Sequence, residues 1–292
     1  MVVDDGSTDG TDEAALAAAS NHGLSIQLIR QSNAGVASAR NAGIRRLRTD
    51  LVTPLDADDL MLPGHINTLA EPFELHRDIA LSFGDAEIFD ERGIISSSFL
   101  RDKPVERLAY DQDKSGFRLI RKDVFASLLR GNYVPACASM LACTAIRSAG
   151  GYDEALPASE DREFLIRLSR FGRFAYTTRA VARVRRHGAS LTAMRKGLAM
   201  ARSGFSALAS ISRRADELAL DCDERIQLDT AFRESARSLF YHASSNGVVT
   251  YLRERRWART VDATCLPFRA KDLARALVRT LYPSRKTNRP LL

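Results

Sequence analysis

Short apolar runs alternate with helical patterns along the first part of the chain. The apolar runs predict strands that end at Asp4, Arg30 and Asp56. Between and after them lie segments with helix signals, such as acidic residues in a first turn and a glycine at the end. Alternating strands and helices are typical of an α/β fold with a mostly parallel sheet and helices on both faces. The segments expected to be helical are residues 12–23, 35–50 and 62–76.

The pattern becomes less regular in the middle of the chain and changes again near residue 195. Residues 79–99 predict two strands, and an acid-led helix is expected from about Glu160. Long helical patterns with few turns occupy the rest of the chain. We therefore expect an α/β domain over residues 1–195 and a helical region over residues 196–292.

The net charge of +7 is concentrated at the C-terminal end. Residues 251–292 contain eleven Lys or Arg and three acidic residues, so this end carries +8 and the first 250 residues carry about −1. A basic end suggests contact with an anionic surface, either lipid or polyphosphate. A solvated helix face that keeps the protein soluble is the alternative. No helix-turn-helix, zinc or RNP pattern accompanies the basic residues, so no nucleic-acid partner is expected.

The segment around residues 268–281 predicts an amphipathic helix within this basic end. Such a helix is typical of peripheral attachment to an anionic membrane. The alternative is that its apolar face packs on the protein's own core. The apolar residues near one face are Phe268, Leu273, Leu277 and Leu281, and the basic residues elsewhere are Lys271, Arg275 and Arg279.

No apolar run approaches the roughly 18 residues of a spanning helix, and no signal-peptide pattern is present. The expected location is the cytoplasm, and a peripheral position at the inner face of the membrane is compatible with the basic end. The cysteines lack the spacing of a zinc site or a disulfide framework, so we expect reduced, mostly buried thiols. They are Cys137, Cys143, Cys222 and Cys265.

Polar side chains follow the ends of the predicted strands. Ligands of α/β sheets bind beyond the carboxyl ends of strands, so we expect these side chains to converge on one crevice. Alternate residues of an extended segment point to the same side, so Asp56 and Asp58 can share one divalent cation with a diphosphate. Acids that only form turns or cap helices are the alternative. The residues expected to converge are Asp4, Asp5, Asn33, Asp56 and Asp58.

Five motifs follow one another along residues 1–192: VVDDGSTDGT, SNAGVASARNAG, LDADD, SEDREFLIRL and RRHGASLT. Their order and intervals resemble those of family 2 glycosyltransferases of the GT-A fold. The resemblance implies a Rossmann-like sheet and transfer of a sugar from a nucleotide-diphosphate sugar, with a UDP-sugar favoured. The acceptor would be a hydroxyl of a glycan or a lipid-linked molecule, as in the biosynthesis of cell-surface polysaccharides.

The resemblance also implies roles at the nucleotide. Asp5, with Asp4 beside it, would contact the base, and Asn33 and Arg40 would lie near the nucleotide. Asp56 would reach the ribose or a metal-bound water. For Asp5 the alternative is a turn cap, and for Arg40 it is a solvent-facing charge on a helix.

Metal binding and catalysis are implied by the remaining motifs. Asp58 matches the carboxylate that binds Mn²⁺ or Mg²⁺, and His187 falls where many members place a metal-ligating histidine, with a surface histidine as the alternative. Asp161 matches the catalytic base of inverting members, with Glu160 beside it. A carboxylate in this position can take the proton of the acceptor hydroxyl as that hydroxyl attacks the anomeric carbon.

Members of this family normally carry one more strand and helix before the segment VVDDGS. We therefore expect that the sequence begins at an internal Met of a longer functional protein, and a degenerate, inactive product is the competing hypothesis. Two further functions stay open beside the enzyme. One is a nucleotide-binding protein without catalysis, and the other is an adaptor that acts through its basic helical end.

Overall fold

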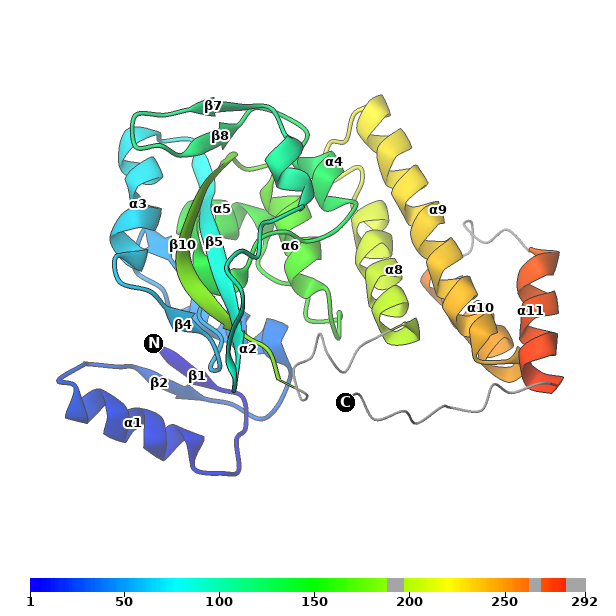
Figure 1. The fold of residues 1–292 in the computed structure, drawn as a ribbon, viewed down its shortest axis with the longest axis horizontal. Coiled ribbons are helices and arrows are strands. Elements are labelled where there is room, and N and C mark those ends of the chain that lie inside the picture. The colour runs from blue at the N-terminus through cyan, green and yellow to red at the C-terminus, as the bar shows by residue number, and fades with distance from the viewer. Residues whose placement is uncertain (188–196, 263–268, 282–292) are drawn as a thin grey trace. The chain divides into compact units, whose positions relative to one another are not determined.

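The computed structural model describes residues 1–187, 197–262 and 269–281 (Figure 1). The chain divides into two compact units, Met1–Ser190 and Leu191–Leu292. The boundary expected after residue 195 and the candidate residues Cys265 and Phe268 lie outside the described residues.

The N-terminal unit opens with two parallel strands, β1 (Val2–Asp4) and β2 (Leu28–Arg30). They are connected by α1 (Thr11–Asn21), whose alanine-rich sequence favours a helix. After β2 the chain continues into α2 (Val36–Ile44), which contacts β1. This strand–helix–strand–helix order is the one that the sequence predicts.

The other strands of this unit form a second sheet of eight strands, and this sheet is mixed. Its long central strands, β5 (Ile79–Asp90) and β10 (Arg173–Arg185), run parallel, whereas all its other pairings are antiparallel. The order is β3–β9–β5–β10–β8–β7, with β4 on β10 and β6 on β5. The remaining strands are β3 (Leu51–Val52), β4 (Leu60–Met61), β6 (Gly93–Ser96), β7 (Tyr110–Gln112), β8 (Arg118–Ile120) and β9 (Ser139–Ala142).

The α/β fold is therefore confirmed, and the larger of its two sheets is mixed rather than mostly parallel. Parallel neighbours need long crossover connections, and β5–β6 and β7–β8 are joined by short turns that impose antiparallel pairing. Within the described residues, no ladder joins β1 or β2 to the mixed sheet.

Helices of the N-terminal unit pack on the mixed sheet. The contacts of one of them, α6, fix the position of the segment that begins at Glu160. Leu69 of α3 lies in a buried cluster with Ala86 of β5 and Val181 of β10. The buried Arg167 of α6 donates from Nη2 to the carbonyl oxygen of Gly151 (2.6 Å), which fastens α6 to the turn after α5. The helices are α3 (His65–Leu75), α4 (Val124–Leu128), α5 (Cys143–Ala149) and α6 (Glu160–Leu168), with short 3₁₀ turns η1 (Pro104–Arg107) and η2 (Ala136–Ala138).

The C-terminal unit is helical, as the sequence predicts, and it has a core of its own. Phe205 stacks on Phe232 with ring centroids 4.8 Å apart, and Phe240 meets the edge of Tyr251. No described helix of the chain is long and apolar enough to cross a membrane. The helices are α8 (Leu198–Arg213), α9 (Cys222–Ser245), α10 (Val248–Val261) and α11 (Ala270–Leu281).

The predicted amphipathic helix is α11, but its apolar face is not the one that packs. The buried residues of α11 are Asp272 and Ala276, whereas Leu277 and Leu281 are 49% and 71% exposed. Arg275 holds the helix in this orientation, because its Nη1 donates both to Asp272 Oδ1 and to Ser244 Oγ of α9 (3.0 Å each). Packing of Leu277 and Leu281 on the protein's own core is therefore excluded.

Three of the four cysteines lie in the described residues. Cys137 and Cys143 are buried, and Cys222 is exposed. Burial raises the pKa of the Cys137 and Cys143 thiols, which keeps them protonated at neutral pH.

Candidate active site

Asp4, at the end of β1, holds the turn that follows this strand. Its side chain is buried, and Oδ1 accepts a hydrogen bond from the backbone N–H of Ser7 (2.9 Å). The hydrogen bonds with Ser7, and the charge of Arg30, lower the pKa of Asp4. Its carboxylate is thus engaged inside the turn.

Asp5 joins this turn to the loop after β2. Its carboxylate accepts hydrogen bonds from Gln31 Nε2 (2.8 Å) and from the backbone N–H groups of Ala34 (2.9 Å) and Gly35 (2.8 Å). Gly6 allows the two loops to approach, because a Cβ on it would lie 2.8 Å from the backbone N of Asn33. The predicted neighbourhood of Asp5 and Asn33 is present, and Asn33 itself is exposed.

Arg40 of α2 connects two predicted motifs that are far apart in the sequence. Its guanidinium donates from Nη2 to Asp56 Oδ1 (2.9 Å) and from Nη1 to Glu160 Oε1 (3.1 Å). The ring of Tyr152 lies 5.4 Å from the guanidinium carbon. Burial opposes the charge, but Tyr152 and the two carboxylates outweigh it and raise the pKa of Arg40. Arg40 is therefore not a solvent-facing helix charge.

Asp58 and His187 meet at the end of β10. Asp58 Oδ2 lies 3.1 Å from His187 Nε2, and both side chains are partly exposed. Arg185 fastens the two segments, because its backbone N–H donates to Asp59 Oδ1 (2.9 Å) and its Nε to the carbonyl oxygen of Asp58 (3.1 Å). Burial raises the pKa of Asp59. The motif LDADD is thus held against the segment that contains His187.

The donor atoms at this point fit an exchangeable divalent cation. Carboxylate oxygen and imidazole nitrogen are ligands that Mn²⁺ accepts, and partial exposure leaves room for water or a ligand oxygen. In the described part of the chain, no group of three or more His, Cys, Asp or Glu could hold a metal. Asp56, the third predicted metal ligand, is paired with Arg40 instead.

Glu160 and Asp161 begin α6. Glu160 is buried, and this burial, together with the charge of Asp161, raises the pKa of Glu160. Asp161 Oδ1 accepts the backbone N–H of Arg162 (2.6 Å), and Oδ2 accepts Asn132 Nδ2 (2.7 Å). Asn132 Oδ1 in turn accepts the N–H of Val134 (2.8 Å), which fixes the orientation of the amide.

The sequence reasoning singled out the carboxylates but missed some of the residues that hold them. Asn132 lies in an irregular segment without a strand or helix pattern, and Tyr152 follows a glycine turn. Arg185 lies inside the motif that ends at Thr192, in which the sequence assigns a role to the histidine alone. A hydrogen-bond partner for Asp59 was predictable from the motif LDADD, because a third acid in one turn needs a partner of its own.

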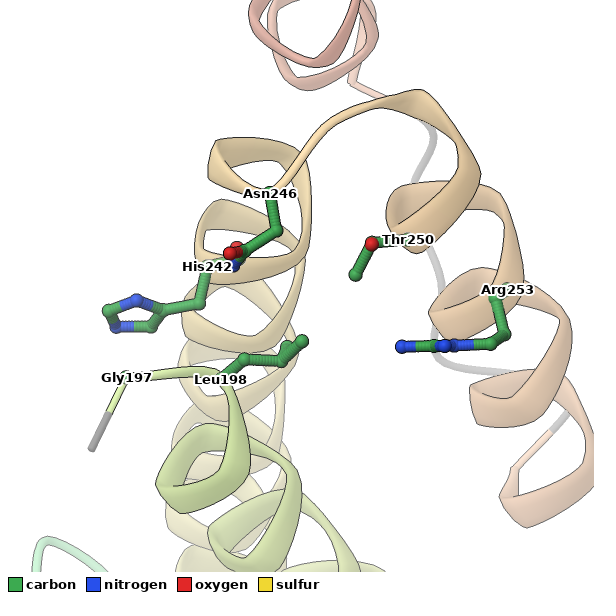
Figure 2. Close-up of a pocket in the computed structure, with 6 residues that line it drawn as sticks. All are labelled: Gly197, Leu198, His242, Asn246, Thr250 and Arg253. Atoms are coloured by element: carbon green, nitrogen blue, oxygen red, sulfur yellow. The ribbon is translucent and has the colours of Figure 1, made fainter. Parts of the chain in front are cut away.

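A separate pocket lies within the C-terminal unit (Figure 2). Its volume is about 450 Å³, and Arg253 projects into it from α10. None of the predicted site residues contributes to it. The lining residues are Gly197, Leu198, His242, Asn246, Thr250 and Arg253.

Comparison with known proteins finds a family that resembles the N-terminal part of the chain. The model of glycosyl transferase family 2 matches residues 1–128, which include the loops of Asp5, Arg40 and Asp58. The N-terminal 128 residues of this chain are thus similar to glycosyl transferase family 2.

Two relatives illustrate the likeness in sequence. The uncharacterized glycosyltransferase MJ1057 of Methanocaldococcus jannaschii is 30% identical over 142 residues, which are 49% of this chain and 43% of that protein. The succinoglycan biosynthesis protein ExoU of Rhizobium meliloti is 41% identical over 71 residues, 24% of this chain and 20% of that protein. The chain thus spans less than half the length of either relative.

Solved structures show the GT-A fold. TarS 1-349 of S. aureus, in complex with UDP, is 15% identical with a TM-score of 0.50, over 100% of this chain and 84% of that one. The mannosyltransferase PcManGT of Pyrobaculum calidifontis, in complex with GDP-Man and Mn²⁺, is 17% identical with a TM-score of 0.51, over 97% and 78%. At these identities the likeness concerns the fold alone.

Proposed function

We propose that this protein transfers a sugar from a nucleotide-diphosphate sugar to a hydroxyl group of a glycan or lipid-linked acceptor. The observation that carries the proposal is the double ion pair of Arg40, which joins Asp56 after β3 to Glu160 at the start of α6. These residues belong to the motifs assigned to the donor and to catalysis. Their adjacency supports one reaction centre built from distant segments.

The donor is proposed to be a UDP-sugar. Asp5 lies in the turn after β1 and accepts hydrogen bonds from the loop that contains Asn33, and the meeting of these two partly exposed segments suits a planar base and its ribose. The UDP bound to TarS and the GDP-Man bound to PcManGT agree with a nucleotide-diphosphate donor in proteins of this fold. Uracil is favoured over guanine only by the sequence motif.

A divalent cation, Mn²⁺ or Mg²⁺, is proposed to be held by Asp58 and His187. When bound, it would neutralise charge on the diphosphate and make it a better leaving group. Asp58 and His187 supply one oxygen and one nitrogen at 3.1 Å from each other, and Asp56 stays on Arg40. Two protein ligands suit a cation that arrives and leaves with the nucleotide.

Asp161 is proposed to be the general base of an inverting transfer. The hydrogen bonds from Asn132 and from the N–H of Arg162 hold its carboxylate in a fixed orientation. The acceptor hydroxyl would give its proton to Asp161 while its oxygen forms the new bond to the anomeric carbon, and the bond to the diphosphate breaks on the opposite side. Glu160, paired with Arg40, would contact the acceptor or support Asp161.

A calorimetric titration of UDP in the presence of Mn²⁺, repeated after addition of EDTA, tests the donor site. Binding that EDTA abolishes supports the proposal, and a screen of sugar donors would follow. Asp58→Ala is expected to abolish metal-dependent binding. Asp161→Asn is expected to abolish turnover and to leave UDP affinity unchanged. Absence of UDP binding under all these conditions would contradict a UDP-sugar donor, and binding without any turnover would favour a non-catalytic nucleotide-binding protein.

The likeness to ExoU also supports a role in the biosynthesis of an extracellular polysaccharide. The cytoplasmic location expected from the sequence stays a prediction. Any peripheral contact with a membrane is proposed for the C-terminal unit.

A further inference from the structure

The C-terminal unit carries a set of exposed apolar side chains on two neighbouring helices. On α10 they are Val249 and Leu252, which are 79% and 55% exposed. On α11 they are Leu277, Val278 and Leu281, which are 49%, 56% and 71% exposed. We call these five residues the apolar face.

The start of α10 adjoins the end of α11. The backbone N–H of Val248 donates to Thr280 Oγ1 (2.9 Å), and the two helices contact each other. Val249 is the next residue on α10, and Leu281 is the next residue on α11. The hydrogen bond therefore places Val249 and Leu281 at the same end of this helix pair.

The helix α11 has three distinct sides rather than two. One side, with Asp272 and Ala276, is buried against the rest of the unit. At 100° per residue, Leu277 and Leu281 fall on a second side and Lys271 on a third, whereas Arg279 lies at the edge of the buried side, about 20° from Asp272. The buried side packs α11 against α9, and the apolar side therefore stays exposed.

The charges exposed on these helices are all of one sign. Glu254 and Asp272 are the only acidic residues of α10 and α11, and they are buried, at 1% and 3% exposure. The exposed basic residues, by contrast, lie on the same two helices as the apolar face. They are Arg253, Arg256 and Arg259 on α10, and Lys271 and Arg279 on α11.

We propose that the apolar face, with the exposed Lys and Arg of the same helices, docks on the surface of a bilayer that contains anionic phospholipid. Exposed Leu and Val side chains enter the boundary between headgroups and acyl chains, and the arginines and Lys271 contact the lipid phosphates. A polyphosphate or a nucleic acid would satisfy the charges but offers no hydrocarbon for the apolar side chains. The combination of both features therefore selects a lipid surface.

This inference does not depend on glycosyl transfer, because the binding needs neither donor nor acceptor. It is tested by co-sedimentation of the full chain with vesicles made of equal parts of phosphatidylcholine and phosphatidylglycerol, beside vesicles of phosphatidylcholine alone. We expect binding to the anionic vesicles that weakens as salt is added, and little binding to the neutral ones. A chain that fails to bind anionic vesicles at low salt would overturn the proposal.

Matched variants separate the apolar face from the rest of the surface. Leu277→Glu combined with Leu281→Glu is expected to weaken vesicle binding at least about tenfold, because the buried apolar area is lost and two negative charges are added. Ile226→Glu is the control for an exposed apolar residue, since Ile226 lies on α9 outside the face and is 64% exposed. It is expected to bind like the wild type. Both changes are at exposed positions, and thermal unfolding checks that the fold is kept.

The basic residues are tested in the same way. Lys271→Gln is expected to weaken binding about fivefold, the effect of one basic residue near an anionic surface. Arg233→Gln, on the exposed surface of α9, is the control and is expected to change binding less than about twofold. Equal effects of the two variants would overturn the assignment, because they would indicate an unspecific effect of net charge.

Size-exclusion chromatography with light scattering distinguishes the other occupants. If the apolar face binds a second copy of the chain, the wild type is a dimer that Leu277→Glu with Leu281→Glu converts to a monomer. A dimer of this kind that does not bind vesicles would overturn the proposal. The proposal is supported if the wild type and the double variant have the same mass and only the wild type binds anionic vesicles.

Discussion

At the scale of single residues, the contact between Asp58 and His187 makes metal dependence the sharpest test of the donor site. Asp58→Ala is expected to lower UDP affinity in Mn²⁺ at least about tenfold, because a carboxylate is the stronger ligand of a hard cation. His187→Ala should lower it less, by several-fold. Calorimetry with and without EDTA measures both effects, and in EDTA all variants should equal the wild type.

The control for these two variants is Asp111→Ala, which removes an exposed acid that is paired with Arg121 on the β7–β8 hairpin. Its UDP affinity should not change. If His187→Ala has no effect while Asp58→Ala does, the histidine is a neighbour of the carboxylate and not a metal ligand.

Asn132 makes a second prediction at this scale, which concerns the position of Asp161. Its amide is fixed by Val134 and donates to Asp161 Oδ2 at 2.7 Å. Asn132→Ala is expected to lower kcat about tenfold and to leave UDP affinity unchanged. Because the lost hydrogen bond leaves the carboxylate free to turn away from the acceptor hydroxyl, the loss is expected in kcat and not in the binding of the donor.

Asn132→Asp extends this test, since a carboxylate in place of the amide cannot donate to Asp161 Oδ2 and should lower kcat at least as much. A role of Asn132 in folding alone would lower thermal stability and UDP affinity together with kcat. That outcome would contradict the assigned positioning role.

At the scale of elements, the sequence predicts what depends on neighbours along the chain. The alternation of β1, α1, β2 and α2 is readable because each element follows from local propensity and turn residues. The closeness of Asp5 and Asn33 follows from the rule that the ends of parallel neighbours meet at one edge. The mixed sheet was missed because strand order depends on contacts between segments far apart in sequence.

The same limit applies to the site. Arg40 is recognisable as a motif residue, but its partners Asp56 and Glu160 lie 16 and 120 residues away, and no periodicity links them. For α11 the sequence shows an apolar side, and hydrophobicity alone favours burying it. The network of Asp272, Arg275 and Ser244 decides otherwise, and such a polar network is invisible in a hydrophobic pattern.

The β7–β8 hairpin offers a prediction on stability and pH. Asp113 accepts hydrogen bonds from Ser115 N (2.9 Å), Ser115 Oγ (2.6 Å) and Phe117 N (3.0 Å). Burial alone would raise the pKa of Asp113, but these hydrogen bonds outweigh it and lower the pKa. Its carboxylate therefore stabilises the fold above the unfolded pKa of about 3.9, and this contribution is lost as the pH falls through the folded value.

Asp113→Asn is accordingly expected to lower the free energy of unfolding by about 1–3 kcal/mol at pH 7, and the difference from the wild type should shrink below pH about 4. Urea unfolding at several pH values measures this difference. His76 Nε2 lies 3.5 Å from Asp113 Oδ2. The variant His76→Gln therefore separates the contribution of His76 from that of the hydrogen bonds within the turn. A difference that stays constant down to the lowest pH would show that the charge of Asp113 is not the cause.

At the scale of the whole molecule, the two units have separate cores, and one residue reports on one of them. Trp257 is the only tryptophan of the chain, and it lies in the C-terminal unit, where Arg202 stands 4.0 Å from its ring centroid and Phe205 5.9 Å. Tryptophan fluorescence therefore follows the unfolding of the C-terminal unit. Circular dichroism follows both units.

UDP with Mn²⁺ is expected to stabilise the N-terminal unit alone, because all proposed ligands of the nucleotide and the metal belong to residues 1–187. At a ligand concentration of a hundred times Kd, the gain is about 2.7 kcal/mol. The midpoint measured by circular dichroism should therefore rise for part of the signal, and the midpoint measured by Trp257 fluorescence should stay in place. Asp58→Ala should remove the rise. If both midpoints rise together, the two units unfold as one cooperative body, and the binding energy of the nucleotide is shared by the whole chain.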